Sequence, residues 1–127
     1  MAFKILIVDD SKLARMAVAK ALNSLRPDWT RLEATNSDEA VALARQSPVD
    51  VALLDFNMPG RDGLALAAEI RALDPNIVLA LISANVQQEI VDRAHQVGAT
   101  FLAKPLTEAA LAAFLAKAEA RFQATPR

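Results

Sequence analysis

The chain has 127 residues, of which 54% are hydrophobic and 23% are charged, and its formal net charge is −1. This size and balance predict one well-packed globular domain and exclude a disordered chain, and the small net charge argues against broad electrostatic attraction to nucleic acid or anionic lipid. The absence of cysteine excludes disulfides and thiolate chemistry, and a single histidine, His95, leaves no material for His-rich metal sites or Ser-His-Asp catalysis.

Strand-like and helix-like segments alternate along the chain. Short apolar or β-branched segments, too short for helices, occupy residues 3–8, 30–34, 49–54, 77–82 and 100–103. Each is followed by a segment with apolar residues at helical spacing, at residues 11–25, 37–46, 64–73, 86–97 and 107–123. Ser11 and Ser37 are predicted N-caps, Pro27 and Pro75 mark breaks, and Gly98 is a predicted helix stop.

The spacing of apolar residues also predicts which face each helix turns to the core. In the first helical segment the predicted inward row is Leu13, Ala17, Ala21 and Leu25. In the fourth helical segment the predicted inward row is Val86, Ile90, Ala94 and Val97. Both rows test the helical assignment directly, since a wrong face would leave large apolar side chains in solvent.

The apolar content of the strands predicts the topology. Segments 3–8, 49–54 and 77–82 are apolar throughout, which indicates burial on both faces of a parallel sheet between helices. The weaker segments 30–34 and 100–103 suit the edges. We therefore predict an α/β, doubly wound (βα)5 fold with a five-stranded parallel sheet of order 2-1-3-4-5 and right-handed crossovers. One domain is expected over residues 1–123, followed by a short polar tail, 124–127.

The start of the chain, "MAFKILIVDDSK", lacks the pattern of a secretory signal. Its apolar run is very short and leads into two acids without a small-residue cleavage site. No apolar run approaches the roughly 20 residues that span a bilayer. We expect a cytoplasmic protein without membrane insertion.

Reactive side chains follow the apolar strands. The first strand ends in Asp9-Asp10, the third in Asp55, the fourth in Ser83 and the fifth in Lys104. The carboxyl ends of parallel strands meet at one edge of a sheet, where such folds bind their ligands. Three close carboxylates raise one another's pKa unless cations sit among them, and a lysine with a divalent ion such as Mg²⁺ would supply that charge. A metal ion, a lysine and a nucleophilic carboxylate are the components of phosphoryl transfer through an aspartyl-phosphate.

The motifs "VDDS", "LLDFNMPGRDG", "ISAN" and "GATFLAKP", in this order and on these strand ends, resemble the receiver domain of two-component response regulators. The layout is similar to that of the stand-alone chemotaxis-type receiver, a flavodoxin-like (CheY-like) fold, over essentially the whole chain. The resemblance implies a signalling domain that catalyses only its own phosphoryl uptake and slow autodephosphorylation, rather than an enzyme.

The resemblance also assigns the acceptor and the metal ligands. It implies that Asp55 takes a phosphoryl group from a phosphohistidine on a sensor histidine kinase or a phosphotransfer protein. It implies that Asp9, Asp10 and Asp55, with the backbone carbonyl of Asn57, hold Mg²⁺ or Mn²⁺. In this reading Asp55 is the middle of a rim of strand ends that also carries Asp9, Asp10, Ser83 and Lys104.

Further positions match the family's switch. The resemblance implies that Ser83 and Lys104 contact the phosphoryl group, that Phe101 is the switch aromatic, and that the Lys104-Pro105 peptide is cis. Phosphorylation would then change the face formed by segments 86–97, 100–103 and 107–123, which would bind a downstream protein target or form a weak homodimer of an otherwise monomeric chain. Direct binding to nucleic acid is not expected.

Other residues have readings independent of the family. Pro59-Gly60 fits a type II turn, and Asp62-Gly63 is read as a helix start rather than a hairpin turn. His95 is expected to be an ordinary polar residue, and Trp29 is expected to pack locally, away from the acids.

Two alternative functions stay open at this point. A small phosphohydrolase of the haloacid-dehalogenase type also forms an aspartyl-phosphate, but that class requires Asp-x-Asp, and Asn57 occupies the second position here. Such an enzyme would also require a substrate cap, for which the chain has no room. The other alternative is a receiver-like module that binds its partner independently of phosphorylation.

Overall fold

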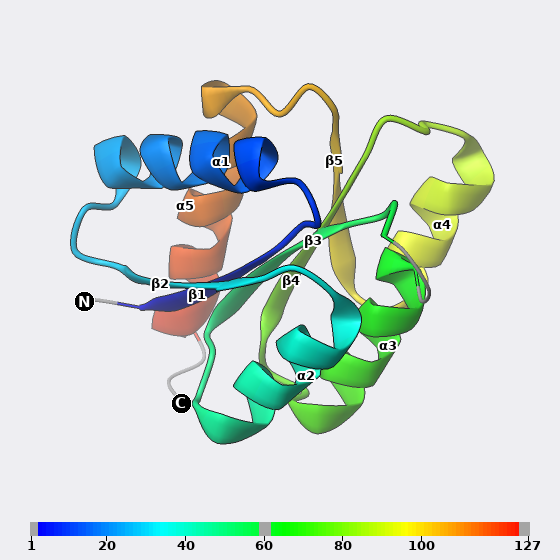
Figure 1. The fold of residues 1–127 in the computed structure, drawn as a ribbon, viewed down its shortest axis with the longest axis horizontal. Coiled ribbons are helices and arrows are strands. Elements are labelled where there is room, and N and C mark those ends of the chain that lie inside the picture. Colours follow the sequence, from blue (N-terminus) through cyan, green and yellow to red (C-terminus); the bar gives the residue numbers. More distant parts are fainter. Residues whose placement is uncertain (1–2, 59–61, 125–127) are drawn as a thin grey trace.

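The computed structural model describes residues 3–58 and 62–124, and a parallel sheet forms its centre (Figure 1). The strands are β1 (Lys4–Val8), β2 (Thr30–Ala34), β3 (Val51–Asp55), β4 (Val78–Ser83) and β5 (Ala99–Ala103). The helices are α1 (Lys12–Leu25), α2 (Ser37–Gln46), α3 (Gly63–Leu73), α4 (Gln88–Gln96) and α5 (Glu108–Ala124). The strand order is β2-β1-β3-β4-β5 with parallel pairing, which confirms the predicted doubly wound fold and its weak edge strands.

Two helical layers cover the two faces of the sheet. Helices α1 and α5 pack on one face, and α2, α3 and α4 pack on the other (Figure 1). Along β1 the side chains alternate between these layers, with Ile5 and Ile7 toward α1 and α5, and Leu6 and Val8 toward α2, α3 and α4. Every residue of β3 and β4 is buried, which accounts for their uninterrupted apolar sequence.

Helix α1 turns a different face to the core from the one predicted. Leu22 is fully buried, and Val18 and Leu25 pack against the same core cluster, whereas Leu13 is 78% exposed and Ala17 is also exposed. The predicted row was therefore wrong at its N-terminal half. The physical reason is that a strict four-residue spacing drifts about 40° around the helix at each step, so that Ala14 and Val18, rather than Leu13 and Ala17, are the partly buried residues at this end.

The ends of three helices are set by short polar side chains. The Asn36 side chain accepts the Glu39 N–H at 2.9 Å, so the N-cap of α2 is Asn36, and the prediction of Ser37 was wrong by one residue. Asp62 accepts the Ala65 N–H at 2.9 Å and caps α3, which confirms the predicted helix start. Ser11 caps α1 as predicted.

Helix α4 begins later than the sequence pattern indicated. It starts at Gln88, and Val86, predicted to face the core, is 63% exposed in the preceding loop. Ile90 and Ala94 are buried as predicted. The apolar row is therefore shorter at its N-terminal end, because the loop after β4 carries the chain outward before the helix begins.

At the amino edge of the sheet, Arg71 joins three segments through main-chain carbonyls. Its guanidinium donates to the carbonyls of Pro75, Ile77, Val97 and Gly98 at 2.6–3.2 Å. Gly98 has φ +73°, which confirms the predicted helix stop after α4, and a Cβ there would lie 3.3 Å from the guanidinium. This arrangement fixes the turn from α3 into β4 against the turn from α4 into β5.

Within residues 3–58 and 62–124, none of the helices combines the length and the apolar character that a membrane crossing requires.

Candidate functional site

The carboxyl edge of the sheet collects the polar residues predicted there. Paired positions across the sheet are Val8 with Leu54, Asp55 with Ile82, and Ser83 with Ala103. Asp9 therefore follows β1 beside Asp55, and Lys104 follows β5 beside Ser83. The register of four strands brings these side chains to one place, as the sequence predicted.

The main chain around Asp55 is tightly packed against the start of α3 at this edge. The residue is only 3% exposed at the end of β3. Gly63 approaches so closely that a Cβ would lie 2.4 Å from the Asp55 carbonyl oxygen and 2.9 Å from the Cα of Phe56. The Gly63 N–H donates to the Phe56 carbonyl at 3.0 Å. A residue without a side chain is thus required where α3 begins, and this contact holds the loop after β3 against the strand end.

Three carboxylates gather around this point. Carboxylate oxygens of Asp9, Asp10 and Asp55 all lie within 4.8 Å of one another. Asp10 is exposed, and Asp9 is partly buried and accepts the Ser11 N–H at 2.9 Å. Burial raises the pKa of Asp9, and the neighbouring carboxylates of Asp55 and Asp10 raise it further, against the Ser11 hydrogen bond and the Lys104 charge. Within the cluster, the negative charge of Asp9 is therefore disfavoured.

Lys104 supplies the compensating charge within this group. Its Nζ lies 2.7 Å from Asp55 Oδ1. Burial lowers the pKa of Lys104, but the hydrogen bond and charge of Asp55 outweigh burial, with support from the charges of Asp9 and Asp10, so the pKa is raised. One ammonium against three ionised carboxylates leaves two negative charges without a counter-charge in this group.

The donor set fits a hard divalent cation. Oxygen atoms at about 2.1 Å from one octahedral ion lie roughly 3 to 4 Å apart, so the three carboxylates would have to close only slightly around Mg²⁺. Carboxylate oxygens suit Mg²⁺ or Mn²⁺, whereas structural zinc prefers nitrogen and sulfur. Asp9, Asp10 and Asp55 could therefore hold such an ion, and its charge would balance the excess.

The loops after β4 and β5 are tied to each other. Ser83 is 1% exposed, and its hydroxyl accepts the Asn85 N–H at 2.9 Å. The Lys104 N–H donates to the Ser83 carbonyl at 3.0 Å. Ser83 is consequently tied through its side chain to the start of the loop to α4 and through its main chain to the residue that carries the ammonium.

The remaining predicted positions are Phe101, Asn57 and the Lys104-Pro105 peptide. Phe101 is partly buried and packs toward the layer of α2, α3 and α4. Asn57 is exposed in the loop after β3, and the Lys104-Pro105 peptide is cis. The predicted turn at Pro59-Gly60 lies outside the described residues.

His95 and Trp29 take no part in this site. His95 is exposed near the end of α4, as an ordinary polar residue would be. Trp29 is buried at the amino edge of the sheet, where it packs against Phe3, so its predicted local packing is confirmed.

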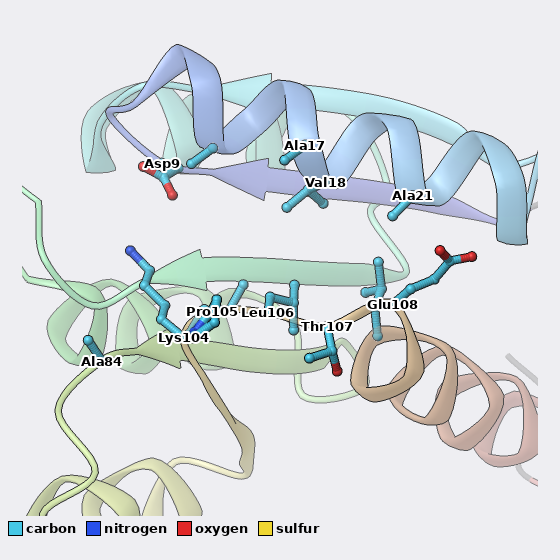
Figure 2. Close-up of a pocket in the computed structure, with 13 residues that line it drawn as sticks. Asp9, Ala17, Val18, Ala21, Ala84, Lys104, Pro105, Leu106, Thr107 and Glu108 are labelled. Carbon is cyan, nitrogen blue, oxygen red and sulfur yellow. The ribbon is translucent and has the colours of Figure 1, made fainter.

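Sequence reasoning missed an apolar groove beside the carboxylates. Figure 2 shows it between α1 and the connection from β5 to α5, with Asp9 and Lys104 at one end. Its volume is about 550 Å³. The signal available in the sequence was the row Ala14, Ala17 and Ala21, which places small side chains on one face of the first helix.

Comparison with known proteins identifies the family. The family model of the response regulator receiver domain matches residues 5–116. The chain is 34% identical to the transcriptional regulatory protein PdtaR of Mycobacterium tuberculosis, over 94% of this chain and 58% of that protein. It is also 34% identical to the chemotaxis protein CheY of Thermotoga maritima, over 83% of this chain and 88% of that protein.

A solved structure agrees with this relationship. A chain in the CheX-CheY-BeF3-Mg complex from Borrelia burgdorferi superposes with a TM-score of 0.83 at 28% identity, over 91% of this chain and 87% of that chain. The chain spans about half the length of several curated relatives that it matches.

Proposed function

The chain belongs to the family of response regulator receiver domains, and on that premise we propose that it accepts a phosphoryl group on Asp55 from a phosphohistidine of a sensor histidine kinase or phosphotransfer protein. Receiver domains are signalling domains rather than typical enzymes, and this chain has that role. The observation that carries the proposal is the buried Asp55 carboxylate, paired with Lys104 at 2.7 Å inside a cluster of carboxylates.

The residues of the site divide the chemistry among them. An Asp55 carboxylate oxygen would attack the phosphorus, and the donor nitrogen would leave with the electron pair of the broken bond. Phosphorylation would remove the negative charge from the Asp55 carboxylate that Lys104 contacts in this structure. Lys104 would therefore move toward a phosphoryl oxygen. A bound Mg²⁺ or Mn²⁺, held by Asp9, Asp10, Asp55 and the Asn57 carbonyl, would supply positive charge for the phosphoryl oxygens.

Ser83 would transmit the effect of phosphorylation to the surface of the domain. Its hydroxyl, which now accepts the Asn85 N–H, would donate to the new phosphoryl oxygens. Through the bond from the Lys104 N–H to the Ser83 carbonyl, the loops after β4 and β5 would move together. Phe101 would repack behind them, and the face of α4, β5 and α5 would change its affinity for a downstream protein.

The setting of this reaction is also part of the proposal. We place the protein in the cytoplasm, with residues 1–123 as the receiver and 124–127 as a tail. We expect it to be a monomer or a weak homodimer through α4, β5 and α5, without direct contact to nucleic acid. The CheX-CheY relative supports protein partners for this class of domain.

Labelling by acetyl phosphate with Mg²⁺ tests the acceptor. Intact-mass analysis should show one added phosphoryl group, lost in Asp55→Asn and retained in Asp28→Asn, which removes an exposed acid from the loop after α1. Unchanged labelling of Asp55→Asn would refute the acceptor, and absence of labelling in the unmodified protein would favour a phosphorylation-independent module. Rapid turnover of a phosphate monoester would favour the phosphohydrolase alternative, which exposed Asn57 does not support, because an amide cannot protonate the leaving group as that class requires.

A further inference from the structure

Two of the three carboxylates belong to the short connection between β1 and α1. Asp9 and Asp10 lie there, outside the regular hydrogen bonding of strand and helix, so each main-chain group needs a partner of its own. The Asp9 N–H donates to the Ala34 carbonyl at 3.1 Å, and the Asp9 side chain accepts the Ser11 N–H at 2.9 Å. The carbonyl of Asp9 remains, and a side chain binds it.

Arg15, near the start of α1, supplies that side chain. Helical side chains lean toward the N-terminal end of their helix, and Arg15 reaches back so that its Nη1 donates to the Asp9 carbonyl at 2.7 Å. Its Nε pairs with Glu33 Oε1 of the edge strand β2 at 3.0 Å. The Arg15 side chain is only 13% exposed, and a planar guanidinium held at two points has little freedom. It is therefore a fixed donor for the Asp9 carbonyl.

The hydrogen bond from Arg15 also orients the residue that follows. A peptide bond is planar, so a fixed Asp9 carbonyl fixes the N–H of Asp10 and the direction in which the chain enters that residue. Asp10 is exposed, yet its carboxylate lies within 4.8 Å of those of Asp9 and Asp55. Repelling carboxylates would separate if the connection could turn freely, and a fixed peptide plane opposes such a turn.

We propose that Arg15 is a positioning residue of the carboxylate site, which holds the peptide between Asp9 and Asp10 so that both carboxylates are preset for a divalent cation. The proposal rests on the metal site of the proposed function. Groups that orient metal ligands commonly set the affinity, and their removal costs about tenfold or more in metal binding. The charge of Arg15 acts in the opposite direction, because a positive charge beside a cation site repels the cation. Position and charge therefore predict opposite signs when Arg15 is removed.

Binding of Mn²⁺, followed by the electron paramagnetic resonance signal of the free ion, tests this sign. Arg15→Ala should raise the Mn²⁺ dissociation constant about tenfold. Arg15→Lys should raise it less, because an ammonium can still donate to the Asp9 carbonyl but cannot span that carbonyl and Glu33 together. The matched control is Lys12→Ala, which removes a positive charge from an exposed position of the same helix close to Asp10. It should leave the constant unchanged or lower it by at most about twofold.

Two further measurements separate positioning from a general loss of stability. Glu33→Gln keeps an oxygen acceptor for Arg15 and removes only a carboxylate charge that is 45% exposed, so the dissociation constant should stay within about twofold of the unmodified protein. In labelling of Asp55 by acetyl phosphate, Arg15→Ala should need about tenfold more Mg²⁺ for half-maximal rate and should reach the same maximal rate. A variant that is merely unfolded in part would lose maximal rate instead, and urea denaturation of the same samples shows the folded fraction.

The results for the unmodified protein and the variants distinguish the two levels of the proposal. A dissociation constant that is unchanged or lower in folded Arg15→Ala would overturn the positioning role, and so would an equal rise in Lys12→Ala. If the unmodified protein binds Mn²⁺ and is labelled on Asp55 in that case, the proposed function stands without this role for Arg15. If the unmodified protein binds no Mn²⁺, the metal site of the proposed function fails, and the role of Arg15 fails with it.

Discussion

The two edges of the parallel sheet surround a positive charge with different groups. At the amino edge, the Arg71 guanidinium donates to four fixed main-chain carbonyls. At the carboxyl edge, the Lys104 ammonium faces three carboxylates and pairs with one of them. The four bonds of Arg71 are all made to groups of the chain, whereas the single charge of Lys104 leaves an excess of negative charge among the described carboxylates.

The difference separates a structural site from a chemical one. Carbonyls are permanent dipoles that cost little to orient once the turns have formed, so Arg71 fixes those turns and needs no ligand. Mutually repelling carboxylates reduce stability unless a cation arrives, and such a cost is typical of functional sites. We therefore expect charge at the carboxyl edge to reduce stability and Arg71 at the amino edge to increase it, and substitutions at the two edges should show this.

The largest effect is expected from the crowded glycine behind Asp55. Gly63→Ala would force a Cβ against the Asp55 carbonyl and the Phe56 backbone, and should lower the free energy of unfolding by about 3 kcal/mol or more. Its counterpart at the amino edge is Gly98→Ala, where φ is +73° and the neighbour is a flexible side chain; a loss of about 1–2 kcal/mol is expected. Urea denaturation followed by circular dichroism measures both, and equal losses would contradict the assignment of the tighter backbone to the carboxyl edge.

The next effect should come from the Arg71 hydrogen bonds. Arg71→Ala leaves four carbonyls without their donor and should lower the free energy of unfolding by about 2–4 kcal/mol. Arg71→Lys should recover only a minor part, because one ammonium cannot span carbonyls arranged around a planar fork. Arg45→Ala, on the exposed last turn of α2, is the control and should cost less than about 1 kcal/mol. Full recovery by lysine would show that charge, rather than geometry, holds the amino edge.

The carboxyl edge should respond with the opposite sign. Asp9→Asn keeps the acceptor for the Ser11 N–H but removes one repelling charge, so without divalent metal it should stabilise the fold by less than about 1 kcal/mol. Since the folded-state pKa of Asp9 is raised, ionisation costs stability as the pH rises through the carboxyl range. The gain should therefore be present at neutral pH and disappear in acid. With Mg²⁺ the order should reverse, because the variant would lack one of the proposed ligands, and a loss of stability at neutral pH without metal would contradict this account.

The smallest effect concerns Glu39, an acid at the same edge whose carboxylate accepts two hydrogen bonds. Glu39 accepts the Thr35 N–H at 2.6 Å and the Thr35 hydroxyl at 2.5 Å, and these bonds lower its pKa. Its contribution to stability should be present above the ordinary glutamate pKa and be lost as the pH falls through the lowered value. Carboxyl titration by NMR should show Glu39 shifted downward and Asp9 upward. Shifts in the same direction would mean that local hydrogen bonding does not distinguish the two acids.

Local sequence patterns were sufficient to predict the helices and strands and the order of the strands in the sheet. Strands apolar throughout specified a parallel sheet, and polar residues at their ends specified a shared edge, because both follow from chain direction alone. Helix faces were less predictable. Leu13 lies on another side of its helix from the buried Leu22, and Val86 lies in a loop before its helix begins; spacing alone fixes neither the rotation of a helix nor its first residue.

The sequence was sufficient to predict which residues form the site, but not the packing around them. The predicted strand ends were enough to place four residues together, because the strands pair in a register that aligns those ends: Asp9, Asp10, Asp55 and Lys104. The contact of Gly63 with the Asp55 carbonyl depends on a distance between two segments, and the groove depends on where α1 lies relative to the connection from β5 to α5. The four carbonyls around Arg71 come from two turns that are far apart in sequence, and no pattern of side chains predicts that they meet.

The aromatic cluster at the amino edge gives the molecule a spectroscopic reporter. Trp29 is the only tryptophan of a chain without tyrosine. It is 4% exposed and meets the ring of Phe3 edge-on at 5.2 Å, and Phe3 in turn lies 5.1 Å from Phe122 near the end of α5. Its fluorescence therefore reports whether the first strand and the last helix are docked together. Because it lies at the edge away from Asp55, emission should follow unfolding faithfully and change little with events at the acids.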